Sequence, residues 1–454
     1  MSLFERERQT IVSNEYVDNF DFAEVEEFVT KADKNLFISH HYATKTKMLV
    51  QPRGGFPTYQ KMFKLYETFA SAGIDVLPIT IDSHTRLNDY ASAKKMLMLS
   101  EENETDMLNG YPLINHGYRT TRKMMTHFNL PVSLRHGTPD ARLLVETAIA
   151  SGIFEIEGGP ITYMLPYSKN FPLDKAFLYW KYVEKVCAHY STLNLPINRE
   201  SFGPLTATLV PPSITIVIQL LEMLLSLEEG VRSFSVSFSQ SGSLSQDIIT
   251  AKVLKKLAPH YAALHGCAGA KTQLVYHQWM GAFPRNKEFS DALITTATLI
   301  ATLVGADKII TKTRDEAFGI PTMECNAQAV ANTQYILRIV QGLPQFEDAE
   351  EEEHLELTVH AIMEAVFNDP ADSLWRKAFN AIKHGIIDVP FSPHIINHNA
   401  ILTLRDPSGS IRIVEPGNVP VPARCLAYER AKAGSFENKT AMVEKIIHDI
   451  GVMQ

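Results

Sequence analysis

The sequence lacks several features that would place it in a familiar class of proteins. Among its 454 residues there are only four cysteines, none of them in a C-x-x-C pair: Cys187, Cys267, Cys325 and Cys425. Such spacing indicates reduced, unpaired side chains in a cytoplasmic protein. The charged start MSLFERERQT has no apolar core, which argues against a secretory signal. The longest apolar run, from Ser213 to Leu227, contains Gln219 and Glu222 and is too short to span a bilayer.

Basic charge is also scarce. Lysine and arginine number 43 against 51 aspartates and glutamates, so the formal net charge is −8. This balance creates no field that favours nucleic acid or an anionic membrane. The chain has no H-E-x-x-H motif, no metal-spaced cysteine set and no Ser-His-Asp order, and we predict no metal ligands. With 45% hydrophobic and 21% charged residues, it has the composition of a soluble protein with a large core.

Short apolar runs alternate with longer amphipathic runs through most of the chain. The nine candidate strands are MLVQPR, VLPITIDS, YPLINHG, PVSLRHG, IFEIEGG, LTATLVP, FSVSFSQSG, QLVYHQWMG and DKIITKT. This alternation predicts a parallel sheet covered by helices, and nine candidates for eight places indicate a (β/α)8 TIM barrel with one wrongly assigned strand. YPLINHG is the shortest. A doubly wound open sheet is the alternative, but no Gly-rich phosphate turn follows the first strand.

The alternation also predicts how the chain is divided. Residues 1–45 form an N-terminal arm, residues 46–335 the barrel, and residues 336–454 a C-terminal α+β extension. In the extension, the acidic run EDAEEEE at residues 347–353 is expected to be a solvated surface loop. The run AILTLRDPSGSIRIVE is typical of a β-hairpin around Asp-Pro-Ser-Gly, and two amphipathic helices follow it.

Charged residues close several of the candidate strands. Arg53, Arg86 and Arg135 each stand at the end of a different strand, and Glu157 ends another. A buried guanidinium without a partner is costly, so three of them at one edge of a sheet indicate a ligand with carboxylates. A guanidinium group binds a carboxylate by two parallel hydrogen bonds, so three such groups suit a ligand with two carboxylates. The carboxylate of Glu157 suits an ammonium group on the same ligand. The residues therefore predict a site for a small amino-dicarboxylic acid such as glutamate.

One near-match to a metal motif lies inside this region. Asp82, His84 and Leu87 approach D-x-H-x-x-G, in which the histidine ligates the cobalt of cobalamin. Leucine replaces the glycine, and the motif lies within the barrel rather than at the head of a Rossmann-like domain. We interpret it as a coincidence.

Longer strings carry a family resemblance. The segments QPRGG, TIDSHTR, LNGYPLINHG, LPVSLRHGTPDARLL, EGGPITYMLPYSK, INRESFGPLTATLVPPS, HQWMGAFP and TKTRDEAFGIPT resemble the large catalytic epsilon subunit of glutamate mutase, also called methylaspartate mutase. The likeness is dense from about Arg53 to Pro321. The arm and the last hundred residues match more loosely.

The resemblance implies a role for each matching residue. Glu157, Arg135, Arg86 and Arg53 fall on the family's catalytic positions, and Glu157 holds the substrate amino group. The implied substrate contacts are Arg53, Arg86, Arg135, His136, Glu157, Tyr163 and Tyr167. The implied contacts to adenosylcobalamin are Gly55, Asn109, Pro166, Phe283, Lys312, Glu316 and Ile320. Within the second set, Lys312 and Glu316 are the expected partners of the adenosine hydroxyls.

The resemblance also implies a reaction and a partner. The family interconverts L-glutamate and L-threo-3-methylaspartate, in glutamate degradation, through a radical that splits into acrylate and a glycyl radical and then recombines. A separate small (sigma) subunit carries the adenosylcobalamin and ligates its cobalt, in a heterotetramer of two large and two small subunits.

Two alternatives stay open at this stage. Proline at position 160 replaces the third glycine of the family's E-G-G-G run, so the substrate could be a related amino-dicarboxylate, or the reaction could serve the biosynthesis of 3-methylaspartate. The second alternative is a non-catalytic barrel that only binds an acidic amino acid. Lys312 and Glu316 count against it, because such a protein needs no contact to adenosine.

Overall fold

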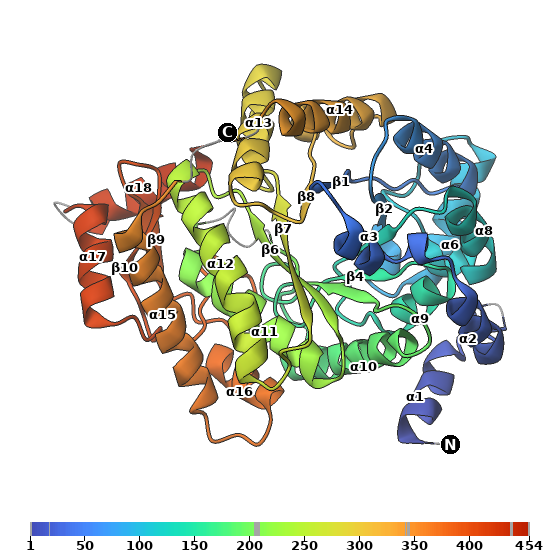
Figure 1. Cartoon of the computed structure of the whole chain (residues 1–454), viewed down its shortest axis with the longest axis horizontal. Helices are drawn as coiled ribbons and strands as arrows, with labels where there is room; N and C mark the ends of the chain where they lie inside the picture. The colour runs from blue at the N-terminus through green and yellow to red at the C-terminus, as the bar shows by residue number, and fades with distance from the viewer. Residues whose placement is uncertain are drawn as a thin grey trace.

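A ring of eight parallel strands forms the centre of the structure (Figure 1). The structure is a computed structural model that describes residues 2–17, 19–203, 209–340, 342, 346–435 and 439–452. The strands are β1 (Leu49–Gln51), β2 (Leu77–Thr80), β3 (Val132–Arg135), β4 (Glu155–Glu157), β5 (Asn198–Glu200), β6 (Ser233–Ser239), β7 (Lys271–His277) and β8 (Lys308–Ile310). They pair in the order β1-β8-β7-β6-β5-β4-β3-β2.

The two ends of this sheet meet. The Val76 amide donates to the Val50 carbonyl over 3.4 Å, and the Thr80 amide donates to the Gly54 carbonyl over 3.0 Å. Each of these bonds joins a residue of one of the two strands to a residue just beyond the other strand, so the ring is nearly closed. The predicted (β/α)8 barrel is therefore confirmed, and all eight carboxyl ends point to one rim.

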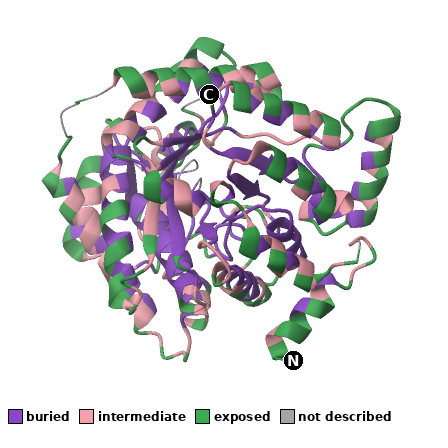
Figure 2. Cartoon of the chain, turned by 45° about the vertical axis from the view of Figure 1, so that its right-hand side comes forward, coloured by how far each residue is buried: buried purple, intermediate pink, exposed green. Residues whose placement is uncertain are grey.

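Helices cover the outside of the ring and connect its strands. They are α4 (Tyr59–Ser71), α5 (Ser83–Arg86), α6 (Tyr90–Glu102), α7 (Leu113–His116), α8 (Tyr118–Phe128), α9 (Arg142–Ala150), α10 (Leu173–Ser191), α11 (Pro212–Glu228), α12 (Leu244–Leu264), α13 (Lys287–Leu303), η3 (Glu316–Phe318) and α14 (Met323–Ile339). Figure 2 shows the strands buried and most outer helices exposed on the side that faces away from them. No helix in the described part of the chain is long and apolar enough to cross a membrane.

Two of the nine candidate strands need correction. YPLINHG contains the short helix α7, and its only strand-like contact in the described chain is a single bridge from Tyr111 to Ile81. LTATLVP spans residues 205–211, of which 205–208 lie outside the described residues, and the remaining positions form no strand. The fifth strand is instead Asn198–Glu200, three polar residues that are all buried. A polar strand that faces the inside of the barrel carries no apolar pattern, so periodicity could not reveal it.

The N-terminal arm consists of α1 (Leu3–Val12), α2 (Phe22–Lys31), η1 (Lys34–Leu36) and α3 (Ile38–Thr44). Buried Arg8 donates to Glu146 over 2.7 Å, which fastens α1 to α9. In Figure 1, α1 and α2 lie against the barrel side that carries α8 to α10, and α3 lies over the centre of the ring.

The C-terminal extension lies on the opposite side of the barrel, beyond α11 and α12 (Figure 1). It contains α15 (Ala349–Phe367), α16 (Leu374–Lys383), β9 (Leu402–Arg405), β10 (Ile411–Glu415), α17 (Ala423–Ala433) and α18 (Lys439–Gly451). The predicted hairpin is confirmed as β9 and β10. The expectation of a loop at EDAEEEE was wrong, because Glu350, Glu351 and Glu352 lie in the first turn of α15, where the helix dipole favours negative charge. Glu351 in that turn is buried and accepts from Arg412 over 2.7 Å.

Candidate functional site

A cavity of about 540 Å³ opens at the carboxyl ends of the strands. Its lining includes all seven residues predicted to contact a substrate: Arg53, Arg86, Arg135, His136, Glu157, Tyr163 and Tyr167. Residues that stand up to 114 positions apart in the sequence (53 to 167) thus share one space. A rim of this kind is where barrel enzymes bind their substrates, and the volume is in the range of small-molecule sites.

Two of the arginines face the cavity without a carboxylate partner among the described residues. Arg53 Nη1 lies 4.0 Å from Met280 Sδ, and Arg86 Nε donates to the Ile81 carbonyl over 2.7 Å. Burial lowers the pKa of Arg86, and the charge of Arg53 lowers it further. Two cations that repel each other in one cavity wall need an anion between them, so this wall suits carboxylates.

Arg135 has a different environment from the other two arginines. It is buried and paired with Glu157, and its two Nη atoms donate to Glu200 over 2.7 and 3.1 Å. Burial alone would lower the pKa of Arg135, but Glu157 and Glu200 raise it. Only its Nε lacks a partner in the described chain. Arg135 therefore belongs mainly to the protein's own charge network rather than standing ready as an open fork.

That network forms the floor of the cavity. Lys308 Nζ lies 2.7 Å from both Glu155 and Glu200. Burial would raise the pKa of Glu200, but Arg135 and Lys308 hold it well below its usual range. Burial raises the pKa of Glu157, against the pull of Arg135. Three carboxylates face two cations here, so the floor carries one unbalanced negative charge and Glu157 presents it to the cavity.

His136 lines the cavity with both ring nitrogens already engaged. Its Nδ1 accepts from the Thr138 amide over 3.0 Å, so Nε2 carries the proton and donates to the Glu157 carbonyl over 2.9 Å. Burial lowers the pKa of His136 to about 3. A neutral imidazole with both nitrogens occupied is poorly placed to act as a base. Here it fixes the backbone that carries Glu157.

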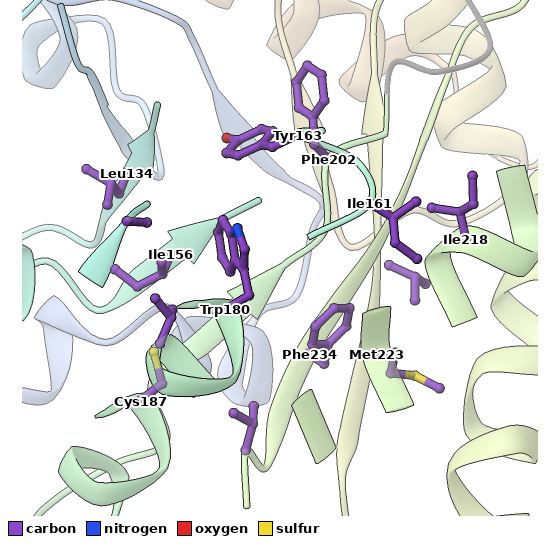
Figure 3. Close-up of a cluster of buried hydrophobic side chains, with 14 of the residues drawn as sticks. Leu134, Ile156, Ile161, Tyr163, Trp180, Cys187, Phe202, Ile218, Met223 and Phe234 are labelled. Carbon is purple, nitrogen blue, oxygen red and sulfur yellow. The ribbon is translucent and has the colours of Figure 1, made fainter. Parts of the chain in front are cut away.

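Tyr163 and Tyr167 lie on residues 158–172, the loop between β4 and α10, here called the tyrosine loop. Gly158 at its start has φ +108°, and a Cβ there would meet the Tyr163 ring at 2.2 Å, so only glycine fits. The Tyr163 hydroxyl donates to Glu157 over 2.7 Å. The centre of its ring lies 5.5 Å from that of Phe202. Figure 3 shows the two rings next to each other. The tyrosines thus close the cavity on the side of Glu157.

Glu222, on α11, holds the first half of this loop. It accepts from the amides of Ile161 and Thr162 over 2.9 and 2.8 Å. Burial raises the pKa of Glu222 to about 7, although these bonds oppose the shift. Pro160, the departure from the family's glycine run, lines a separate small space between α10 and α11 rather than the substrate cavity. The proline therefore changes how the loop is supported, not a surface that a ligand touches.

We predict that Glu222→Gln changes how stability depends on pH. The folded carboxyl keeps its proton up to about pH 7, whereas the unfolded chain loses it near about pH 4.3. This contribution to stability is present below about pH 4.3 and is lost as the pH rises to about 7. Glutamine keeps an acceptor without the charge, so at pH 8 the variant should be more stable by about 2–3 kcal/mol.

Urea unfolding at pH 5 and pH 8 checks this prediction. At pH 5 the variant and the natural protein should agree within about 1 kcal/mol. Glu101→Gln, on the exposed side of α6, is the matched control and should shift neither value. A variant that loses stability at pH 8 would show that Glu222 holds the loop as a carboxylate.

A second cavity, of about 230 Å³, adjoins the first and shares Arg53, Arg86 and Lys312 with it. It is lined by five of the seven residues predicted to contact a cofactor: Gly55, Asn109, Lys312, Glu316 and Ile320. Lys312 is paired with Glu316. Burial and Arg53 lower the pKa of Lys312 to about 8, and Glu316 opposes the shift.

The remaining two predicted cofactor residues do not line this second cavity. Phe283 is buried, and the Lys312 Nζ lies 5.7 Å from its ring centre. Pro166 is half-buried in the tyrosine loop, directly before Tyr167.

Reasoning from strand ends missed several residues of the site. Glu200, Phe202 and Lys308 belong to it. Glu200 ends a strand that periodicity did not find, Phe202 follows that strand, and Lys308 is the first residue of β8. Glu157, Glu200 and His277 also offer ligand atoms within 4.8 Å of one another. Both carboxylates of this group pair with Arg135, and Glu200 also pairs with Lys308.

The fold and the cavity define a class: a (β/α)8 barrel with a charged cavity of small-molecule size at the carboxyl ends of its strands. The family described as Methylaspartate mutase E chain matches residues 33–454. The chain belongs to this family.

Curated relatives agree over nearly the full length. "Glutamate mutase epsilon subunit" of Desulfitobacterium hafniense is 36% identical over 98% of this chain and 95% of its own. The proteins of the same name from Yersinia enterocolitica and Halobacterium salinarum are both 37% identical, over 89% and 85% of this chain and 85% and 81% of their own.

Proposed function

We propose that this chain is the catalytic subunit of a glutamate mutase, which interconverts L-glutamate and L-threo-3-methylaspartate with adenosylcobalamin by a radical fragmentation and recombination. The observation that carries the proposal is the cavity, with Glu157 on one side and, on the other, Arg53 and Arg86, which have no carboxylate partner in the described chain. The names of the relatives support the same reaction. The four unpaired cysteines suit the reducing cytoplasm.

The charges of the cavity match those of the substrate. Glutamate carries two carboxylates and one ammonium group. Arg53 and Arg86 bind the carboxylates by two-point contacts, and Arg135 adds its free Nε. Glu157 binds the ammonium group, which balances the negative charge left over on the floor of the cavity. The hydroxyls of Tyr163 and Tyr167 complete the contacts.

The second cavity fits the nucleoside part of adenosylcobalamin. A Cβ at Gly55 would meet the Thr80 carbonyl at 2.4 Å, so glycine keeps the wall open where a flat ring can approach the backbone. Lys312 and Glu316 offer a donor and an acceptor for the ribose hydroxyls. When bound, adenosylcobalamin supplies the radical that starts the rearrangement.

The side chains of this chain then control the reacting fragments. A substrate radical that splits in two loses one half unless each half is held, and the arginines at separate strand ends hold both. Glu157 keeps the amino group in place and modulates its proton while the glycyl fragment exists. The rings of Tyr163 and Phe202 close the cavity and exclude water.

The cobalamin itself is carried by a separate small subunit, in a heterotetramer of two large and two small subunits. In this chain the near-motif has a different use. Asp82 caps α5 by accepting from the amides of His84 and Thr85 over 2.9 and 3.0 Å. A capping aspartate explains this motif without cobalt.

We predict that activity requires the partner. The purified chain alone should bind adenosylcobalamin weakly and convert no glutamate, and adding the small subunit with adenosylcobalamin should restore turnover. His84→Ala should leave the nitrogen coupling of cobalt in the electron paramagnetic resonance spectrum unchanged. Turnover without a partner, or loss of that coupling, would refute the proposal that the small subunit carries the cobalamin and ligates its cobalt. Glutamate binding without turnover in the full mixture would instead favour a barrel that only binds.

A further inference from the structure

The C-terminal extension contacts the tyrosine loop directly. Residues 388–401, between α16 and β9, form a segment here called the bracket. Ser392 Oγ donates to the Leu165 carbonyl over 2.6 Å, and the Ile395 amide donates to the Lys169 carbonyl over 3.1 Å. His394 Nε2 lies 3.0 Å from the Phe171 carbonyl. These three bonds all reach the second half of the loop, on both sides of Tyr167.

The tautomer of His394 makes this third contact a true hydrogen bond. Its Nδ1 accepts from the Ile396 amide over 3.3 Å, so Nε2 carries the proton and donates. Ser392 and His394 are both buried, and the Ser392 Oγ also accepts from the His394 amide over 3.2 Å. The two side chains therefore form one unit whose remaining donors point at the loop.

The bracket is itself rigid. Asp388 is fully buried and accepts from the amides of Asn399, Ala400 and Ile401 over 2.8, 2.7 and 2.9 Å. Phe391, next to Ser392, has φ +60°, a left-handed conformation that is strained for an aromatic residue. Such strain persists only where the surrounding contacts determine the backbone, and it is frequent where geometry serves function.

The tyrosine loop is thus fastened at two places. Glu222 holds its first half through Ile161 and Thr162, and the bracket holds its second half. Tyr167 needs the second attachment. Its side chain is 59% exposed and packs on Tyr163 and Phe202 with ring centres 6.4 and 5.7 Å away, so contacts of its own do not fix it.

We propose that the bracket positions Tyr167 in the cavity, and that Ser392 and His394 are positioning residues for substrate binding. The extension is then a structural part of the substrate site, although no residue of the bracket lines the cavity. The inference rests on the proposed function, because it takes the occupant of the cavity to be the substrate. Since Tyr167 contributes binding contacts, loosening it should act mainly on KM for glutamate rather than on kcat.

The test uses Ser392→Ala and His394→Ala in the full chain, reconstituted with the small subunit and adenosylcobalamin. Each should raise KM for glutamate about tenfold, with kcat changed by less than about threefold, because a small displacement of a positioning group is enough. Hydrogen exchange of amides in residues 160–171 should quicken, while amides of β3 and β6 stay protected. Ser392→Thr and His394→Gln keep the donors and should restore both measurements.

A matched control lies in the same segment. His398 is exposed, and its Nε2 lies 2.8 Å from the Lys383 carbonyl within the extension, so His398→Ala should alter neither KM nor loop exchange. Unchanged loop exchange in both alanine variants would overturn the proposal, as would faster exchange with an unchanged KM. If the natural protein converts no glutamate, the proposed function fails instead, and loop exchange still decides whether the bracket holds the loop.

Discussion

Arg86→Met should abolish activity and yet stabilise the fold. Arg86 is partly buried, repelled by Arg53 and without an acidic partner in the described structure, so its charge opposes folding. Methionine of similar length removes the charge, and the free energy of unfolding should rise by about 0.5–1 kcal/mol. The same change removes a fork for a substrate carboxylate, so kcat/KM should fall at least about a hundredfold. Steady-state kinetics of the reconstituted enzyme and thermal unfolding measure the two effects.

Arg135→Met is the matched contrast. It removes the same group, but here Glu157 and Glu200 both lose a cationic partner inside the barrel. Breaking a buried pair by removing one member costs about 3–5 kcal/mol, so this variant should unfold at a markedly lower temperature. If Arg86→Met were the less stable of the two, Arg86 would hold the structure together and the interpretation of the cavity as an anion site would fail.

The contrast between these arginines also shows how far the sequence could predict the site. Each follows a strand of the barrel, and the carboxyl ends of parallel strands meet at one rim, so their convergence followed from the fold. Periodicity located seven of the strands because each of them carries buried apolar side chains. It follows that Arg53, Arg86, Glu157 and Lys312 could be placed together before any coordinates.

What the sequence could not reveal is pairing across the barrel. Glu200 lies on a strand of three polar residues, so neither the strand nor the partner of Arg135 could be predicted. Lys308 and Glu155 meet over 2.7 Å although 153 residues separate them, and no local pattern encodes that contact. For the same reason the contacts of Ser392 and His394 with the tyrosine loop were beyond prediction. They join two segments more than 220 residues apart.

Glu157→Gln and Lys312→Ala should separate substrate binding from cofactor binding at the same rim. Glutamine keeps an acceptor for Tyr163 but removes the negative charge that faces the substrate ammonium group. Affinity for glutamate should weaken by about 2–5 kcal/mol and kcat should fall, while affinity for adenosylcobalamin stays nearly unchanged. Lys312→Ala should have the reverse effect, raising the apparent Kd for adenosylcobalamin and leaving binding of a competing glutamate analogue largely intact.

The ionisation of Lys312 sharpens this last prediction. Because burial and Arg53 lower the pKa of Lys312 to about 8, against Glu316, its ammonium group is charged below pH 8 and neutral above it. Cofactor affinity of the natural complex should therefore weaken as the pH rises through 8, and Lys312→Ala should abolish that dependence. Lys256→Ala, which removes a surface lysine paired with Glu356 over 2.5 Å, should preserve it. If Glu157→Gln and Lys312→Ala weakened both ligands equally, the division of the rim into a substrate half and a cofactor half would be wrong even within the right family.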